Sequence, residues 1–271
     1  MTVKTALTQA DREPADDPSD VSTLLRWVER PNGRMELRET PLTPEDYLDP
    51  QEGDTWVQGE RHNSTRGFLA QMFRLHFCDD PEILVTEDLK FLLGPGLSRP
   101  APDVAVVRGV HRGDRGVFDV VAEGIAPCLI IEVVSPKSRR IRKIDVKDKV
   151  DDYRRAGVPE YVIVDRPTRG ENSPFELVGY RLDSVGGYRR IEPDAQGRLL
   201  CETIGVWIGL SPDRLHVLLW NAATGERMLS PEEAVAARDT EIAARDTEIA
   251  RLRAELEQLR EPRQTRPARD S

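Results

Sequence analysis

A glutamate interrupts one of the most apolar runs of this chain, Leu129-Ile130-Ile131-Glu132-Val133-Val134-Ser135. A continuous run of Ile, Val and Leu predicts a strand that is buried on both faces of a sheet. An ionised carboxylate in such a strand costs several kcal/mol unless a partner compensates its charge. Glu132 therefore indicates either a buried ion pair with an arginine or a site that holds a metal ion.

The segments that follow Glu132 predict an α/β fold with a mixed sheet and flanking helices. A strand over Cys128–Ser135, a helix from about Ile144 to Ala156 and a strand over Glu160–Asp165 form a unit that implies a parallel crossover. Gly157 is the residue type expected just after a helix ends. We expect a further helix at Asn63–Phe77, strands at Ile83–Thr86, Lys90–Leu93 and Asp103–Arg108, and antiparallel hairpins from Phe175–Leu182, Tyr188–Ile191, Leu199–Leu210 and Leu215–Trp220. The Pro-punctuated segment Trp27–Tyr47 gives no assignment.

Composition excludes several classes of protein. No run of about 18 apolar residues exists, so we expect no membrane span. The polar leader, residues 1–22, lacks the apolar stretch of a signal peptide, which predicts a cytoplasmic protein. The 3 cysteines are far apart and show no CxxC pair, which disfavours a zinc site or a disulfide framework. The net charge of −9 disfavours a general nucleic-acid coating protein, but it leaves a nuclease open.

The C-terminal part repeats seven residues: residues 237–243 have the same sequence as residues 244–250. One heptad position holds Val235, Ile242, Ile249 and Leu256, and the position three further on holds Arg238, Arg245, Leu252 and Leu259. This spacing predicts a coiled coil that joins two copies of the chain, and the alternative is a single solvated helix with i,i+4 ion pairs. The predicted domains are a disordered leader (1–22), an α/β domain (23–228), a coiled-coil helix (229–262) and a disordered tail (263–271).

Two further residues point toward Glu132. Asp103 opens an earlier apolar strand, although Pro-Asp is also common in turns. On a helical wheel, Lys149 shares the apolar face of its helix with Val146 and Tyr153. A lysine on that face either pairs with an acid such as Glu132 or extends its charged end past the edge of the sheet. Asp145 is interpreted as a helix cap.

Two acids and a lysine on a buried scaffold suit a metal-dependent phosphodiesterase. Mg²⁺ or Mn²⁺ prefers carboxylate oxygens, here those of Asp103 and Glu132, and polarises both phosphate and water. Lys149 would orient or deprotonate the water and neutralise developing charge. A basic run lies between Glu132 and Lys149, and it is either a phosphate contact or a solvated loop: Lys137, Arg139, Arg140, Arg142 and Lys143.

These motifs, in this order, resemble the putative restriction endonuclease family of the PD-(D/E)XK nuclease superfamily, over roughly residues 50 to 225: Pro102-Asp103, Glu132-Val-Val-Ser135-Pro136, Lys149-xxx-Tyr153 and Gly157-Val-Pro-Glu-Tyr161. The lysine position of the superfamily's Glu-x-Lys motif holds Val134, and Lys149 matches a lysine that has moved to the following helix.

The resemblance implies a PD-(D/E)XK core, a Mg²⁺- or Mn²⁺-dependent endonuclease and a double-stranded DNA substrate. It also implies an upstream acid and a histidine near the first helix, for which Glu60 and His62 are the matches. For His62, an ordinary core histidine is the alternative. For the whole chain, the alternative is a catalytically idle nuclease-like fold that serves as a nucleic-acid or protein interaction module.

Overall fold

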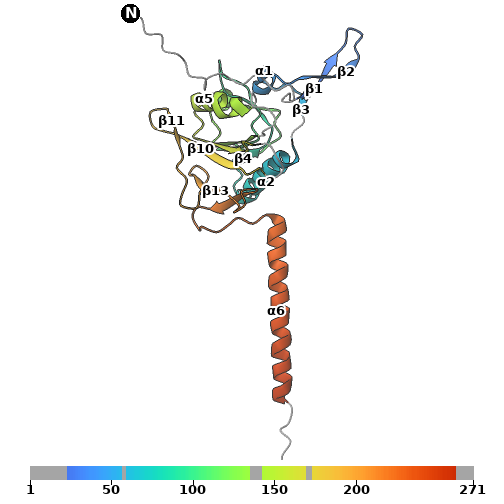
Figure 1. Cartoon of the computed structure of the whole chain (residues 1–271), viewed down its shortest axis with the longest axis vertical. Coiled ribbons are helices and arrows are strands. Elements are labelled where there is room, and N and C mark those ends of the chain that lie inside the picture. The colour runs from blue at the N-terminus through green and yellow to red at the C-terminus, as the bar shows by residue number, and fades with distance from the viewer. Residues whose placement is uncertain (1–22, 57–58, 135–141, 169–172, 261–271) are drawn as a thin grey trace, which may run out of the picture. The chain divides into compact units, whose positions relative to one another are not determined.

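The computed structural model describes residues 23–56, 59–134, 142–168 and 173–260, and for residues 257–260 it describes the backbone alone. The chain divides into two units, residues 1–227 and 228–271. The strands of the largest sheet of the first unit are β4 (Ile83–Thr86), β6 (Val104–Arg108), β8 (Leu129–Val134), β9 (Glu160–Asp165), β10 (Glu176–Leu182) and β11 (Tyr188–Arg190). Their order across the sheet is β11-β10-β9-β8-β6-β4 (Figure 1).

The centre of this sheet is the parallel pair β8 and β9. All six residues of each strand are buried, as continuous apolar runs predict. The other neighbouring strands pair antiparallel, so the predicted mixed sheet is confirmed. A π-helical turn, η2 (Ile144–Asp148), and helix α5 (Lys149–Arg155) form the crossover. Gly157 follows this helix with φ +77, a left-handed conformation that glycine adopts without strain.

Helix α2 (Glu60–His76) lies on the opposite side of the sheet from α5 (Figure 1). It packs on β4, β6 and β8 and buries Leu69, Met72 and Phe73. The helix begins three residues before the predicted start, because the N–H of Asn63 already donates to the carbonyl of Gly59. Most of the residues of this first turn are polar, so hydrophobic periodicity could not reveal it.

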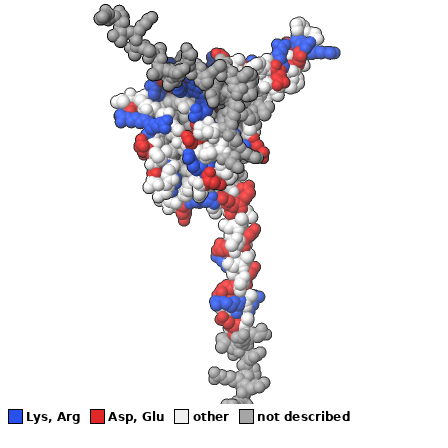
Figure 2. Space-filling view, in the orientation of Figure 1, with Lys and Arg blue, Asp and Glu red and all other residues white. Residues whose placement is uncertain are grey.

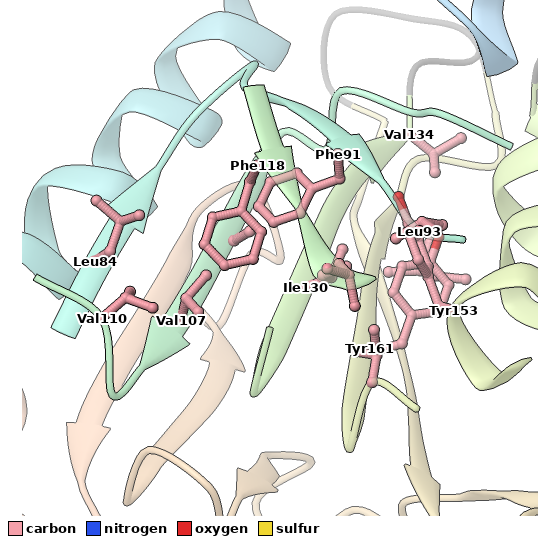
Figure 3. Close-up of a cluster of buried hydrophobic side chains, with 14 residues drawn as sticks. Leu84, Phe91, Leu93, Val107, Val110, Phe118, Ile130, Val134, Tyr153 and Tyr161 are labelled. Atoms are coloured by element: carbon pink, nitrogen blue, oxygen red, sulfur yellow. The ribbon is translucent and has the colours of Figure 1, made fainter. Parts of the chain in front are cut away.

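A core cluster fills the side of the sheet that faces α5 (Figure 3). It includes Phe91 and Phe118, from the short parallel strands β5 (Lys90–Leu92) and β7 (Val117–Asp119), with ring centroids 5.1 Å apart. Helix α3 (Val120–Glu123) follows β7 directly. Ile130 and Val134 of β8 belong to the same cluster. Alternate residues of a strand share a face, so Glu132 also points toward α5.

Two smaller sheets complete the first unit. Strands β1 (Thr23–Glu29), β2 (Met35–Pro41) and β3 (Thr55–Trp56) form one of them, and with helix α1 (Pro44–Leu48) they include the unassigned segment Trp27–Tyr47. Strands β12 (Leu199–Cys201), β13 (Val206–Leu210) and β14 (Val217–Asn221) form the other. Both neighbouring pairs are antiparallel, as the predicted hairpins require, and a turn with Gly205 at φ +64 separates β12 from β13 within Leu199–Leu210.

The second unit contains one helix, α6 (Pro231–Arg260). Ser230 and Glu233 cap its start reciprocally, each side chain accepting from the other's backbone N–H. Acidic and basic residues are distributed along the surface of this helix (Figure 2). The apolar heptad side chains are 46–60% exposed: Val235, Ile242, Ile249, Leu252 and Leu256. Within the described residues, no helix combines the length and the apolar composition that crossing a membrane requires.

Candidate active site

Asp103 and Glu132 come together across the antiparallel pair β6 and β8. Val104 lies opposite Ile131, so continuing this register by one residue brings Asp103 opposite Glu132. Directly opposite side chains have Cβ atoms about 4.5–5.5 Å apart. The N–H of Val133 donates to Asp103 Oδ2 over 2.7 Å and fixes that carboxylate against β8. The two acids are only 4% and 1% exposed.

Lys149 joins these acids from the first residue of α5. Its Nζ atom lies 2.9 Å from Glu132 Oε1, and its side chain is 2% exposed. The helical wheel predicted this inward direction. The hydroxyl of Tyr153, one turn later, donates to the same oxygen over 2.8 Å. The backbone N–H of Lys149 donates to the carbonyl of Ile144, a π-type bond of the kind that is frequent at functional sites.

Asp145 is a third buried acid of this site, and its interpretation as a helix cap is wrong. Helical residues already precede it, so it cannot be the residue that caps the helix start. Its Oδ1 atom lies 2.8 Å from Lys149 Nζ, and both carboxylate oxygens accept from the hydroxyl of Tyr47 over 3.1 Å. The ring of Tyr47 also lies 4.3 Å from Lys149 Nζ. The i,i+4 spacing of Asp145 and Lys149 was the available sequence signal.

One ammonium group is therefore shared by two carboxyl groups. Burial raises the pKa of Glu132 to about 8, although Lys149 opposes this rise. Burial also raises the pKa of Asp145 against the same lysine. For Lys149, burial alone would lower the pKa, but Asp145 and Glu132 outweigh it and raise it. These directions are compatible, because one positive charge compensates one carboxylate while the other remains costly to ionise. Lys149 thus keeps its proton.

His62 reaches the site from the first turn of α2. Its Nε2 atom lies 2.9 Å from Asp103 Oδ1, and the side chain is 8% exposed. Burial alone would lower the pKa of His62, but Asp103 outweighs it and raises it. Conversely, burial would raise the pKa of Asp103, and His62 lowers it. Nδ1 of this ring is buried and has no hydrogen-bond partner among the described residues.

The structure gives the other predicted site residues no described contact with Asp103, Glu132 or Lys149. Glu60 is exposed at the start of α2, and the described residues give it no hydrogen bond to the acids or the lysine. Arg142 forms a bidentate salt bridge with Asp165 at the end of β9, over 3.1 and 2.5 Å. Lys143 is exposed. The remaining members of the basic run lie outside the described residues: Lys137, Arg139 and Arg140.

The donor set fits Mg²⁺ or Mn²⁺. The described residues contain no group of three or more His, Cys, Asp and Glu side chains arranged to hold a metal ion. Mg²⁺, however, keeps several waters and takes one or two protein carboxylates, which Asp103 and Glu132 can supply. Asp103 accepts one hydrogen bond on each oxygen, and each carboxylate oxygen has a second lone pair.

The chain belongs to a family described as putative restriction endonucleases (Uma2), whose model matches residues 27–211. Membership of this family supports a nuclease activity for the chain. No curated protein matches the chain. Among solved structures, a putative nuclease belonging to DUF820 from Anabaena variabilis ATCC 29413 is 17% identical, with a TM-score of 0.37. The match covers 54% of this chain and 77% of that chain, and a TM-score this low supports no further conclusion.

Proposed function

We propose that this protein is a metal-dependent endonuclease that hydrolyses phosphodiester bonds in DNA. Asp103 and Glu132 are the proposed ligands of Mg²⁺ or Mn²⁺, and Lys149 is the proposed catalytic lysine. The observation that carries this assignment is the 2.9 Å contact between Lys149 and Glu132, both buried in the core of the α/β domain. Charged groups are seldom buried for stability alone, since apolar residues of similar volume are often as stable. Family membership supports the nuclease part of the proposal.

The residues of the site divide the work as follows. The metal ion, when bound, supplies polarisation of the phosphate and of the attacking water. Lys149, kept protonated by its two acids, donates hydrogen bonds to the water or to a phosphate oxygen and compensates developing negative charge. Tyr153 and Tyr47 hold Glu132 and Asp145 through their hydroxyl groups. His62 orients Asp103, whereas Glu60 remains a candidate on the resemblance alone.

Supercoiled plasmid provides the direct test. Purified full-length protein with Mg²⁺ or Mn²⁺ is expected to convert the plasmid to nicked and then linear forms, and EDTA is expected to stop the conversion. Conversion that EDTA leaves unchanged would contradict the metal requirement. If neither plasmid nor single-stranded DNA is cut with either ion, over a range of protein and salt concentrations, the endonuclease is contradicted.

The alternative is a catalytically idle nuclease-like fold that binds nucleic acid or protein. Charge favours it: the chain carries −9, and on the visible face of Figure 2 acidic residues lie among the lysines and arginines. Arg142 is also engaged by Asp165. A protein that binds DNA but cuts neither plasmid nor single strands with any divalent ion would match this alternative.

We further propose that α6 joins two copies of the chain as a coiled coil. Its apolar heptad residues are about half exposed, and a stripe of this kind is normally covered by a partner helix. Two active sites related by a two-fold axis could address both strands of a duplex. Arg238 and Arg245 occupy the seam near its start, so we expect modest, salt-sensitive association.

Sedimentation tests this assembly. The full chain is expected to run as a dimer at tens of micromolar, and a truncation that ends at Ser230 as a monomer. Replacing Ile242 and Ile249 by Asn should have the same effect as truncation, because a polar pair in the seam weakens pairing. A full chain that stays monomeric would show that α6 is a single solvated helix.

A further inference from the structure

A groove of about 890 Å³ opens beside the candidate active site. The loop from Pro50 to Trp56 forms one wall, and Asn63 and Arg66 of α2 form another. Asp88 and Lys90 also line the groove, and both carry charges. Its volume lies within the range of about 300–1,000 Å³ that is typical of ligand pockets.

Two contacts and one pair of consecutive residues connect this groove to the buried acids. The ring of Trp56 lies 5.9 Å from that of Tyr47, whose hydroxyl donates to Asp145. The N–H of Asp88 donates to the carbonyl of Pro102, the residue before Asp103. Asn63 directly follows His62 in α2. A molecule in the groove therefore lies next to the site where the phosphate would be cut.

The charges of the groove do not suit a phosphate. Arg66 forms an ion pair with Asp88. Lys90 Nζ lies 2.5 Å from Asp49 Oδ1 and 2.7 Å from the carbonyl of Pro50. The cations on the walls are thus already engaged by acids, and a polyanionic backbone would meet those acids as well.

A nucleobase suits the same lining better. Trp56 is half-buried and lines the groove, and every base has a π face that can stack on an aromatic ring. Asp88 and Asn63 add side-chain oxygens that accept hydrogen bonds from the exocyclic amino groups of bases.

We propose that this groove receives an unpaired base of the substrate strand, stacked on Trp56, beside the phosphate to be cleaved. The proposal deepens the endonuclease assignment and rests on it. It makes the substrate a DNA strand with at least one unpaired base, such as a single strand, a loop or a flap. A fully paired duplex would have to turn a base out of its stack before it could enter.

Binding measured without cleavage tests the groove. Full-length protein in EDTA is titrated into a labelled single-stranded oligonucleotide and into a labelled, fully paired hairpin duplex, with fluorescence anisotropy as the readout. Wild type is expected to bind the single strand more tightly. Trp56→Ala should weaken that binding about 5- to 150-fold, the equivalent of one base–aromatic stack. Trp56→Phe should keep most of it.

Trp27→Ala is the matched control, because Trp27 is 54% exposed on β1 and does not line the groove. It should leave binding within about twofold of wild type. Thermal melting of each variant shows whether it is folded. An oligonucleotide series with one abasic position sharpens the test: at the position that enters the groove, the effect of Trp56→Ala should vanish, since the base is already absent.

The outcomes separate this inference from the endonuclease itself. If wild type cuts plasmid and Trp56→Ala binds and cuts like wild type, the groove assignment is wrong and the endonuclease stands. If single-strand binding depends on Trp56 but no substrate is cut with any divalent ion, the endonuclease is wrong and the base-binding groove stands. Wild type that binds the paired hairpin more tightly than the single strand also overturns the groove assignment.

Discussion

Two buried glutamates on neighbouring parallel strands have opposite surroundings. Glu132 of β8 is 1% exposed and Glu160 of β9 is 0% exposed. Glu160 is the first residue of its strand, whereas Glu132 lies toward the carboxyl end of its own. In open α/β sheets ligands bind beyond the carboxyl ends of the strands, so position alone already separates the two acids.

The partners of Glu160 tie separate parts of the fold together. The N–H groups of Glu202 and Thr203 donate to it over 2.9 and 3.0 Å, and the hydroxyl of Thr203 over 2.5 Å. Arg181 of β10 adds a charged donor at 2.9 Å. These donors come largely from the turn between β12 and β13, so the carboxylate fastens that small sheet to the central one.

Glu132, in contrast, accepts hydrogen bonds from side chains. Lys149 and Tyr153 both belong to α5, and a second acid, Asp103, lies across the strand pair. Its pKa is raised to about 8 chiefly because it is buried. The comparison teaches that burial of an acid does not mark a reactive site by itself. Glu160 accepts from two backbone N–H groups as well as from side chains, whereas the described donors to Glu132 are two side chains of one helix.

Cleavage should separate the two glutamates most strongly. Glu132→Gln and Lys149→Gln are each expected to lower the initial rate of plasmid nicking by about 10²–10⁴-fold, the range for loss of an acid–base or charge-stabilising group. Glu160→Gln should keep the wild-type rate per folded molecule, and Lys147→Gln, an exposed neighbour of Lys149, is the matched control. Equal losses of nicking rate in Glu132→Gln and Glu160→Gln would contradict the assignment of a catalytic site to Glu132 and a structural role to Glu160.

The free energy of unfolding should be lowered more by Glu160→Gln than by Glu132→Gln. Glu160→Gln places an amide among fixed N–H donors and should lower the free energy of unfolding by about 1–3 kcal/mol. Glu132→Gln should lower it less, because Lys149 keeps its contact with Asp145. Urea midpoints for the two variants and wild type, at constant m-value, measure the difference. A larger loss in Glu132→Gln than in Glu160→Gln would mean that Glu132 is the more structural acid.

The sequence predicted the parts of this comparison that depend on local pattern. The apolar runs predicted β8, β9 and the crossover between them, and the i,i+3 and i,i+4 positions predicted that Lys149 points inward. Tyr47 was missed because it belongs to the unassigned segment and meets Asp145 at a separation of 98 residues. No periodicity along the chain encodes such a contact.

Glu160 shows the limit of the same reasoning. It stands in an apolar run, Glu160-Tyr-Val-Ile-Val-Asp165, and carries the same signal that drew attention to Glu132. Its donors lie 42 and 43 residues further along, in a turn whose position the sequence did not reveal. A buried acid can therefore be found from sequence, but what compensates its charge cannot.

Metal binding should also distinguish the two acids. Mn²⁺ at ten times its dissociation constant is expected to stabilise wild type and Glu160→Gln by about 1.4 kcal/mol relative to EDTA. Glu132→Ala and Asp103→Asn should lose this increment, because each removes a proposed ligand. Calorimetric titration checks the same point without unfolding. Heats of binding that survive in Glu132→Ala would move the metal site elsewhere.

The smallest expected difference comes from removing one hydroxyl at each glutamate. Tyr153→Phe deletes a donor 2.8 Å from Glu132, and Thr203→Val deletes one at 2.5 Å from Glu160. A single hydrogen bond contributes about 0.5–1.5 kcal/mol, so Tyr153→Phe should slow nicking about 2- to 10-fold by loosening the acid beside Lys149. Thr203→Val should shift the urea midpoint by a similar free energy and leave the rate unchanged. A rate loss in Thr203→Val as large as that in Tyr153→Phe would mean that fixing Glu160 also positions the active site through β9.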